Sequence, residues 1–517
     1  MKKIKTSVRR IDALDQELSE IISSYFHLTK EDSDKFVAKR FHPHIARLKE
    51  SIHCLIEWPY IDRVFRDSYY NYFSSKSTHS QRDCIRVSFF DQVLDDGEDS
   101  TQFRNKESIK DLKKSFRGYI VIRPTPPFIV GRNLISPHAL KVNSFESCFV
   151  DSSATVNAVK MKVKGFPHSS QDTETITCAE TTLWSCMEYF GSKYPEYKPV
   201  LPSQIIKALS HTAHQRQLPS NGLDSRQISS ALKEFGFGSK IYDSEIYTPE
   251  RFASLFSCYI ESGIPIIVGL NKRIGTKISG APMWDTNSTG HAILGIGREA
   301  ITPELVDSCN DETPLSNGKV VIDLNGIKKQ FVIIDDNLPP YQLAYFDKPC
   351  ENYEEDEWKK NQIAYFIVPL HTRVYLEAYE ARKFVLDLLD VSEAQLPDNT
   401  TVAMRFYLTS SRSYKHWVAS HSDMDPSLRS IILGISMAKF LWVAELGTKE
   451  TFREKKANGL VLIDATSANT HQLNPLILSI HDGLFVSYDP DTNNILRAEI
   501  PLSKFSIYEN NLKQPAS

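Results

Sequence analysis

Cys178 is the residue of this chain best placed to act as a nucleophile, because the pattern around it predicts a helix that begins at the cysteine itself. Thr177 and Glu180 form a capping-box pair, which marks the first turn of a helix. The apolar residues that follow have helical spacing, at Ala179, Leu183, Met187 and Phe190, and Gly191 suits the end of the helix. Free N–H groups and the helix dipole favour a thiolate at such a position, and the thiolate is the reactive form of cysteine.

A nucleophilic cysteine needs a base, and the base needs a partner that fixes its tautomer. His291 is the predicted base, because it lies between a polar loop and an apolar strand, where a side chain can face a cleft. Asp335 and Asp336 end a later strand and are expected to point to its opposite faces, so that only one of them can face and orient the histidine. Gln171, seven residues before Cys178, could donate a side-chain amide to an oxyanion, together with the backbone N–H of Cys178.

Helices come first and strands follow around these residues, which predicts an α+β arrangement. The expected helices include one introduced by the capping pair Asp224 and Gln227. The expected strands include one starting at His291 and two joined by a turn at Asn325-Gly326. Residues 271–290 are polar and rich in small residues, and we expect a loop that covers the site. Trp284 in this loop either contacts the substrate or the closed loop, or pins the loop to the core.

The rest of the chain divides into flanking regions with patterns of their own. Residues 8–75 have helical spacing, and β-rich segments follow up to residue 165. Residues 371–517 mix helical and strand patterns and end in a hairpin. The predicted domains are therefore residues 1–165, a helical and then β-rich region, residues 166–370, which carry the chemistry, and residues 371–517, a mixed α/β unit.

Composition limits the class of protein. The chain has 517 residues, 41% of them hydrophobic and 24% charged, with a net charge of −3, which is ordinary for a globular protein of several domains and shows no overall preference for nucleic acid. No signal peptide or membrane-spanning run is apparent, and the scattered cysteines form no CxxC pair. We therefore predict a cytoplasmic location, no membrane association and no disulfide framework. Neither a cofactor nor a metal is expected, because no acidic or cysteine ligand accompanies His42, His44 and His53 at a recognisable spacing.

Three short segments together resemble the papain-like cysteine peptidases, in particular the C39-like group. They are the helix opened by Cys178, TGHAILGIG around His291, and VIIDDNLPPY around Asp336. The resemblance covers residues 168–370 and implies a helix-borne cysteine packed on an antiparallel sheet that carries the histidine and the acid. It also implies that a glutamine before the cysteine, here Gln171, completes the oxyanion hole.

The expected function is therefore a thiol hydrolase that cleaves a peptide or isopeptide bond with a Cys178–His291–Asp336 triad. Acyl transfer by the same triad, as in transglutaminase-like enzymes, is an alternative, and an inactive papain-like binding protein is another. The partner in each case is a protein or peptide, and the flanking regions could bind a further protein.

Overall fold

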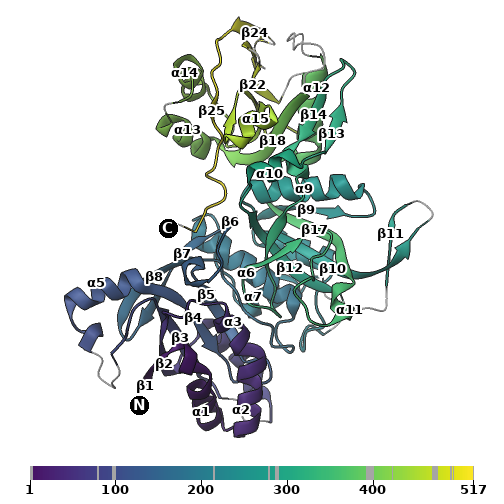
Figure 1. Cartoon of the computed structure of the whole chain (residues 1–517). Coiled ribbons are helices and arrows are strands. Elements are labelled where there is room, and N and C mark those ends of the chain that lie inside the picture. The colour runs from purple at the N-terminus through teal and green to yellow at the C-terminus, as the bar shows by residue number, and fades with distance from the viewer. Residues whose placement is uncertain are drawn as a thin grey trace.

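The computed structural model describes residues 4–77, 81–95, 101–212, 216–277, 280–285, 290–391, 401–421, 423–468, 475–481, 483–489, 492 and 494–515. Helices and strands alternate through these residues, and the strands form large sheets whose pairs are mostly antiparallel. The α+β expectation is confirmed at this level. Figure 1 shows three bodies, with the N-terminal sheet below, the middle sheet beside and above it, and the C-terminal sheet at the top.

The N-terminal sheet has the strand order β1-β2-β3-β4-β5, and each strand pairs antiparallel with the next. Its strands are β1 (Lys5–Arg10), β2 (His53–Tyr60), β3 (Cys84–Phe90), β4 (Phe116–Ile122) and β5 (Val130–Ile135). Its α-helices are α1 (Leu14–Phe26), α2 (Lys30–Phe36), α3 (His42–Ala46), α4 (Arg63–Asn71) and α5 (Lys106–Ser115), and the short helices η1 (Ile11–Ala13), η2 (Val37–Phe41), η3 (Phe73–Ser75), η4 (Thr101–Phe103) and η5 (Pro137–Ala139) lie between elements.

The prediction of helix throughout residues 8–75 is wrong at β1 and β2. The strand β2 pairs with β1 on one edge and with β3 on the other, and it is buried at every residue from Cys54 to Glu57, so both of its faces are covered there. A strand covered on both faces loses the alternation that would identify it, and its apolar residues also fit the spacing of a helix.

The middle sheet has the order β16-β15-β12-β10-β17-β9 and carries the predicted site. Helices α6 and α9 pack against its strands β10 and β12. The sheet consists of β9 (Phe237–Asp243), β10 (Ile266–Thr276), β12 (His291–Glu299), β15 (Gln330–Ile334), β16 (Gln342–Tyr345) and β17 (Asn361–His371), with β6 (Phe145–Ser147) and β11 (Pro282–Trp284) at its sides; its helices are α6 (Cys178–Lys193), α7 (Pro202–Ala208), α8 (Ser225–Glu234), α9 (Pro249–Glu261) and α11 (Asp356–Lys359).

The predicted loop at residues 271–290 is largely a β-hairpin instead. The strand β10 continues to Thr276 and pairs with β11, so that Arg273 lies opposite Trp284. This hairpin projects from the body of the molecule (Figure 1). Residues 278–279 and 286–289 of the predicted loop lie outside the described residues.

The C-terminal sheet has the order β13-β14-β18-β19-β21-β22-β23-β24. Its strands are β13 (Glu312–Pro314), β14 (Val320–Asp323), β18 (Thr401–Ser410), β19 (Phe440–Gly447), β21 (Gly459–Asp464), β22 (Leu476–His481), β23 (Leu484–Asp489) and β24 (Asn494–Glu499). Around it lie α10 (Pro303–Asp307), η6 (Leu324–Gly326), α12 (Ala378–Val391), α13 (Ser411–Ser420), α14 (Pro426–Gly434), α15 (Lys449–Arg453) and the pair β20 (Lys456–Ala457) and β25 (Phe505–Ser506), while the ribbon of β7 (Val150–Val156) and β8 (Val159–Gly165) lies near the N-terminal sheet.

Sheet membership does not follow the predicted boundary at residue 370. The strand β14 pairs in parallel with β18, so the segment around it belongs to the C-terminal sheet although it precedes β15 in the sequence. The predicted turn at Asn325-Gly326 therefore does not join a hairpin but connects two different sheets. The two strands have the apolar pattern of a hairpin, and pattern alone does not identify the partner of a strand.

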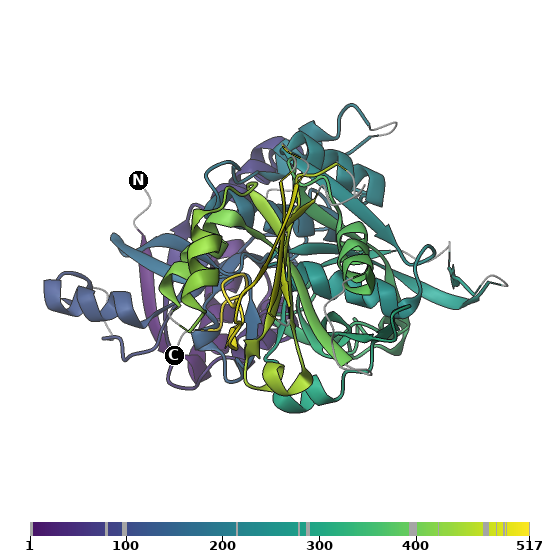
Figure 2. The same ribbon diagram turned by 90° about the horizontal axis from the view of Figure 1, so that it is seen from above.

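The three bodies share their interior. One continuous cluster of buried apolar side chains runs from Val8 in the N-terminal sheet through Leu294 in the middle sheet to Trp442 in the C-terminal sheet. After β25 the chain descends from the C-terminal body, and Lys513 pairs with Ser147 of β6. Seen from above, the C-terminal sheet lies over the other two bodies (Figure 2).

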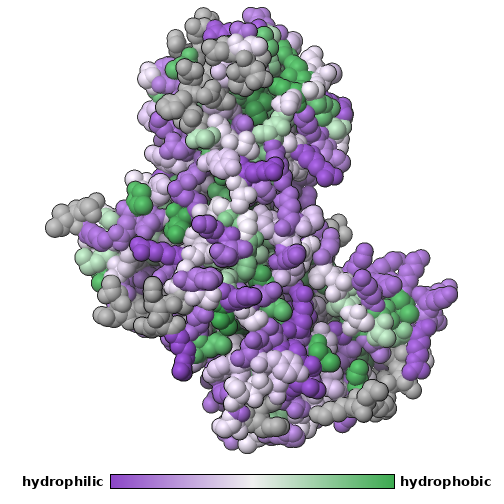
Figure 3. Space-filling model, turned by 180° about the vertical axis from the view of Figure 1, so that it is seen from behind, coloured by the Kyte–Doolittle hydropathy of each residue, from purple (hydrophilic) through white to green (hydrophobic). Residues whose placement is uncertain are grey.

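One face of the molecule is mainly hydrophilic. On the face seen in Figure 3, hydrophilic residues predominate and apolar residues form small separated groups. Among the described residues, no helix is long and apolar enough to cross a bilayer.

Candidate active site

Cys178 is the first residue of α6, as predicted, and Thr177 is the N-cap. The capping box is present, with the Glu180 carboxylate accepting a hydrogen bond from the Thr177 N–H at 3.1 Å. The helix runs past the predicted end at Gly191 and finishes at Lys193. Cys178 is partly exposed whereas the other cysteines are buried, so Cys178 is the thiol that a substrate can reach.

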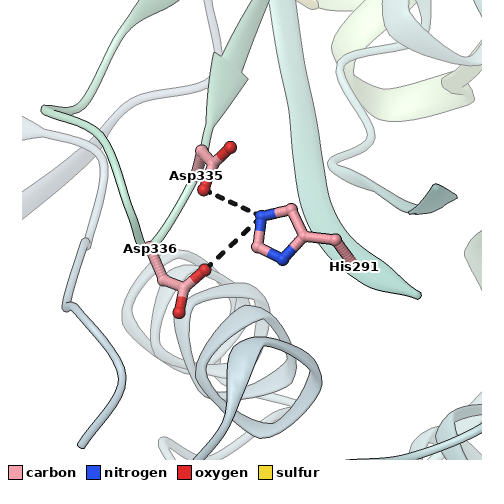
Figure 4. A group of neighbouring side chains, drawn as sticks. All are labelled: His291, Asp335 and Asp336. Carbon is pink, nitrogen blue, oxygen red and sulfur yellow. Dashed lines mark hydrogen bonds and ion pairs between the residues drawn. The ribbon is translucent and has the colours of Figure 1, made fainter. Parts of the chain in front are cut away.

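His291 is the first residue of β12 and is 5% exposed. The helix and the strand are tied together one turn into α6, where the Thr182 hydroxyl donates a hydrogen bond to the carbonyl of Ala292 at 3.0 Å. On its other side, His291 Nε2 lies 3.0 Å from Asp335 Oδ1. Figure 4 shows that the second ring nitrogen, Nδ1, points away from both aspartates.

The surroundings of His291 favour its protonated form. Burial alone would lower the pKa of His291, but the charge and hydrogen bond of Asp335 outweigh it, and a hydrogen bond with Cys178 adds to the effect. The pKa is raised well above its ordinary value. An imidazolium at this place is the partner that a thiolate requires.

The hydrogen bond to His291 comes from Asp335, not from the favoured Asp336. Asp336 Oδ1 lies 3.7 Å from the same nitrogen, as Figure 4 shows. The prediction assumed that the two residues point to opposite faces of a strand, but β15 ends at Ile334. Alternation of side chains therefore does not apply, and both carboxylates lie near the histidine.

Asp335 is held as an ionised acceptor by several donors. Besides His291, the backbone N–H of Asn337 donates to its Oδ1 at 2.9 Å and the Tyr353 hydroxyl donates to its Oδ2 at 2.8 Å. Burial would raise the pKa of Asp335, but the attraction of His291 and these hydrogen bonds lower it. Asp335 thus has the charge and the position needed to fix the orientation of the imidazole.

An aromatic pair that sequence reasoning missed covers the His291–Asp335 contact. The Tyr353 ring stacks on Trp358 at 4.7 Å, and Trp358 packs edge-on against the His291 ring at 5.1 Å. Shielding from water strengthens a hydrogen bond between charged groups. The available signal was two aromatic residues in the acidic stretch ENYEEDEW, where neither has an obvious core role.

Gln171 lies on the loop before α6, and its side-chain N–H donates to Asn337 Oδ1 at 3.2 Å. The neighbouring Asp172 fixes this loop, because its Oδ1 accepts the backbone N–H groups of Glu174, Thr175 and Ile176 at 2.7–3.0 Å. Gln171 lines the same cleft as Cys178.

Buried groups of the N-terminal region hold the loop that carries Gln171 and the loop that carries Asp335. His168 Nε2 lies 2.9 Å from the carbonyl of Asp335, and its Nδ1 accepts from Asn133 at 2.7 Å. Arg123 donates to the carbonyls of Ser170 and Gln171 at 3.1 and 2.9 Å. The N-terminal region is therefore part of the framework of the site, which no sequence motif indicated.

A cleft of about 1280 Å³ passes the thiol and the histidine. Cys178, His291 and Gln171 line it, and so does Trp284 from β11, the residue predicted to contact substrate. Residues of the N-terminal region form another part of the wall, including Lys39, Arg40 and Phe128. The structure thus brings every predicted site residue to this cleft or, for the two aspartates, directly behind it.

In comparisons with known proteins, no protein-family model and no curated protein matches this chain.

Proposed function

We propose that the protein is a papain-like thiol hydrolase that cleaves a peptide or isopeptide bond with a Cys178–His291–Asp335 triad. The observation that carries the proposal is the position of His291. One of its ring nitrogens is bound by the buried Asp335, and the Cys178 thiol, at a helix start, forms a hydrogen bond with the same imidazole. This order of nucleophile, base and orienting acid is the arrangement that acyl chemistry needs.

In the first half of the reaction, His291 Nδ1 takes the proton of the Cys178 thiol, and the sulfur attacks the substrate carbonyl carbon. The resulting oxyanion accepts hydrogen bonds from the Gln171 amide and the backbone N–H of Cys178. The C–N bond then breaks, and His291 gives its proton to the departing amine, which leaves a thioester on Cys178.

In the second half, His291 takes a proton from water, and the hydroxide oxygen attacks the thioester carbon. The C–S bond breaks, the acid is released, and the sulfur recovers its proton from His291. Asp335 stays ionised throughout, because its task is to hold the imidazole and to stabilise its positive charge.

The cleft favours a polypeptide over a small substrate. Its volume of about 1280 Å³ exceeds the 300–1,000 Å³ typical of small-molecule sites, and it continues past the triad along the N-terminal wall. An extended chain of several residues fits such a groove.

The direct test is labelling with a peptide carrying a thiol-directed electrophile, followed by mapping of the modified residue. We expect a single adduct on Cys178, its loss in Cys178→Ala, and its retention in Cys186→Ala, which removes a buried thiol of the same helix. No adduct on Cys178 in folded protein at neutral pH would contradict the proposal. Product analysis with a cleaved peptide then separates hydrolysis, which gives a free acid, from acyl transfer, which gives an amide.

A further inference from the structure

Asp336 has no part in the mechanism above, yet it is buried beside the triad. It is 4% exposed, and neither of its carboxylate oxygens accepts a hydrogen bond from the described residues. The backbone N–H groups of Asp336 and Gln171 lie near it without reaching hydrogen-bond geometry. One of these oxygens lies 3.7 Å from His291 Nε2, which is an ion-pair distance without a hydrogen bond. A buried carboxylate without a hydrogen bond is costly, and a bound cation would stabilise it.

The Asp336 carboxylate lies near two other atoms that can bind a metal. His291 Nε2, a carboxylate oxygen of Asp335 and a carboxylate oxygen of Asp336 all lie within 4.8 Å of one another. Figure 4 shows both carboxylates directed at the same ring nitrogen. The ligand atoms of a tetrahedral zinc site are about 3.3–3.5 Å apart, because each lies roughly 2.0–2.1 Å from the metal. The nitrogen-to-oxygen distances here, 3.0 Å and 3.7 Å, lie on either side of that value.

The donor set indicates the class of ion. An imidazole with carboxylates suits zinc and neighbouring first-row ions, whereas calcium and magnesium prefer oxygen alone. A divalent ion would also neutralise the two carboxylates. The nearby buried Arg123 does not do so by direct contact, because its guanidinium donates to backbone carbonyls such as those of Ser170 and Gln171.

We propose that His291, Asp335 and Asp336 bind one divalent ion of the zinc type, and that the bound ion stops the thiol hydrolase. The inhibitory half rests on the proposed function. The metal takes the Nε2 lone pair and releases the Nε2 proton to solvent, so the remaining proton of the neutral imidazole is on Nδ1. A protonated Nδ1 cannot accept the proton of Cys178, and metal binding and catalysis exclude each other.

Binding is tested with Zn²⁺ alone by calorimetry on the full chain carrying Cys178→Ala, which excludes a site that uses the thiol. We expect one ion per chain, with affinity reduced by at least about tenfold when Asp336→Asn is added. Ca²⁺ should not compete. The matched control is Glu354→Gln, an exposed acid on the wall of the same cleft, which should bind Zn²⁺ unchanged. If Asp336→Asn does not fold, His291→Ala must show the same loss.

Absence of stoichiometric Zn²⁺ binding to the Cys178→Ala chain, or unchanged affinity in Asp336→Asn, would overturn the metal site. Inhibition is tested separately, by electrophile labelling of Cys178 in the wild-type chain. Zn²⁺ should suppress labelling, EDTA should restore it, and Asp336→Asn should be labelled at Zn²⁺ concentrations that protect the wild type. Calorimetry does not depend on turnover, so a failed proposal for the peptidase and a failed proposal for the metal give different results.

Discussion

Cys178 and Cys186 lie on the same helix, but only Cys178 is exposed to the cleft. We expect Cys178→Ala to abolish turnover with little change in thermal unfolding, because the side chain contributes little packing. Burial raises the pKa of the Cys186 thiol, so Cys186 is inert as a nucleophile. Cys186→Ala should retain kcat and lose about 0.5–3 kcal/mol of stability. Measured turnover and melting curves check both, and a turning-over Cys178→Ala chain would exclude the triad.

The two aspartates should respond differently to the same substitution. Asp335→Asn removes the charge that holds the imidazole, and we expect kcat to fall by about 10²–10⁴. Asp336→Asn leaves the hydrogen bond between His291 and Asp335 intact, so kcat should fall less than tenfold when a chelator is present. Steady-state rates on one peptide at neutral pH decide this. Equal losses at both positions would mean that the two acids share the orienting role.

At the scale of elements, the site depends on how loops are held between the sheets. His168 is fully buried and joins Asn133 to the carbonyl of Asp335. His168→Ala should leave that carbonyl unsatisfied, which costs on the order of 1–3 kcal/mol. Because the loop of Asp335 is then less fixed, kcat should fall while labelling still maps to Cys178. Normal kcat with reduced stability would make His168 purely structural.

The sequence predicts local features of the site well, because they depend on neighbouring residues. The start of α6 follows from Thr177 and Glu180, and the start of β12 follows from the change from polar to apolar residues at His291. Long-range contacts carry no such signal. The sequence pattern does not predict that β14 pairs with β18. It also does not predict that Tyr353 and Trp358 cover His291, because these contacts join residues far apart in the chain.

The choice between Asp335 and Asp336 shows the same limit. It depended on where β15 ends, and strand ends are set by the partner strands: β15 pairs with β12 and β16 only as far as Ile334. The two acids differ in their burial partners rather than in their local sequence. Their pKa values differ for this reason. Burial and the negative charge of Asp335 raise the pKa of Asp336 to about 7, whereas the pKa of Asp335 is lowered by His291.

A buried lysine between α9 and the start of β15 gives a pH-dependent prediction. Lys329 is 2% exposed and donates to the Ser257 hydroxyl at 2.7 Å. Burial lowers its pKa to about 8, against the attraction of Glu261. Between pH 8 and the ordinary lysine pKa, the unfolded chain binds one proton more than the folded chain, so stability rises with pH.

The measurement is the free energy of unfolding in urea at pH 8 and pH 10, compared between the wild type and Lys329→Met. The wild type should gain on the order of 2 kcal/mol relative to the variant over this interval. The difference between the two chains cancels the titration of other groups, including the tyrosines. A difference that does not change with pH would mean that Lys329 stays protonated in the folded protein.

At the scale of the whole molecule, the shared core predicts that the middle region cannot fold alone. Glu261 of its helix α9 forms an ion pair at 3.2 Å with Arg405 of the C-terminal sheet. On the other side, Arg47 of the N-terminal region donates hydrogen bonds to the carbonyls of Pro340 and Tyr341, in the loop between β15 and β16. A fragment of residues 166–370 should lack cooperative unfolding and electrophile labelling at Cys178. A soluble fragment with both properties would show an independent domain.

The path of β13 and β14 also bears on the order in which the chain matures during synthesis. These strands are made before β15 and β17 complete the middle sheet, but β18, the parallel partner of β14, is not complete until residue 410. During synthesis β14 therefore has one unpaired edge until β18 is made. An unpaired strand edge is a site at which other chains can add a strand. The segment at Lys513 then forms a single bridge to Ser147, so the final packing brings together residues made early and late in synthesis. The interval between synthesis of β14 and synthesis of β18 is thus the one in which β14 lacks its parallel partner.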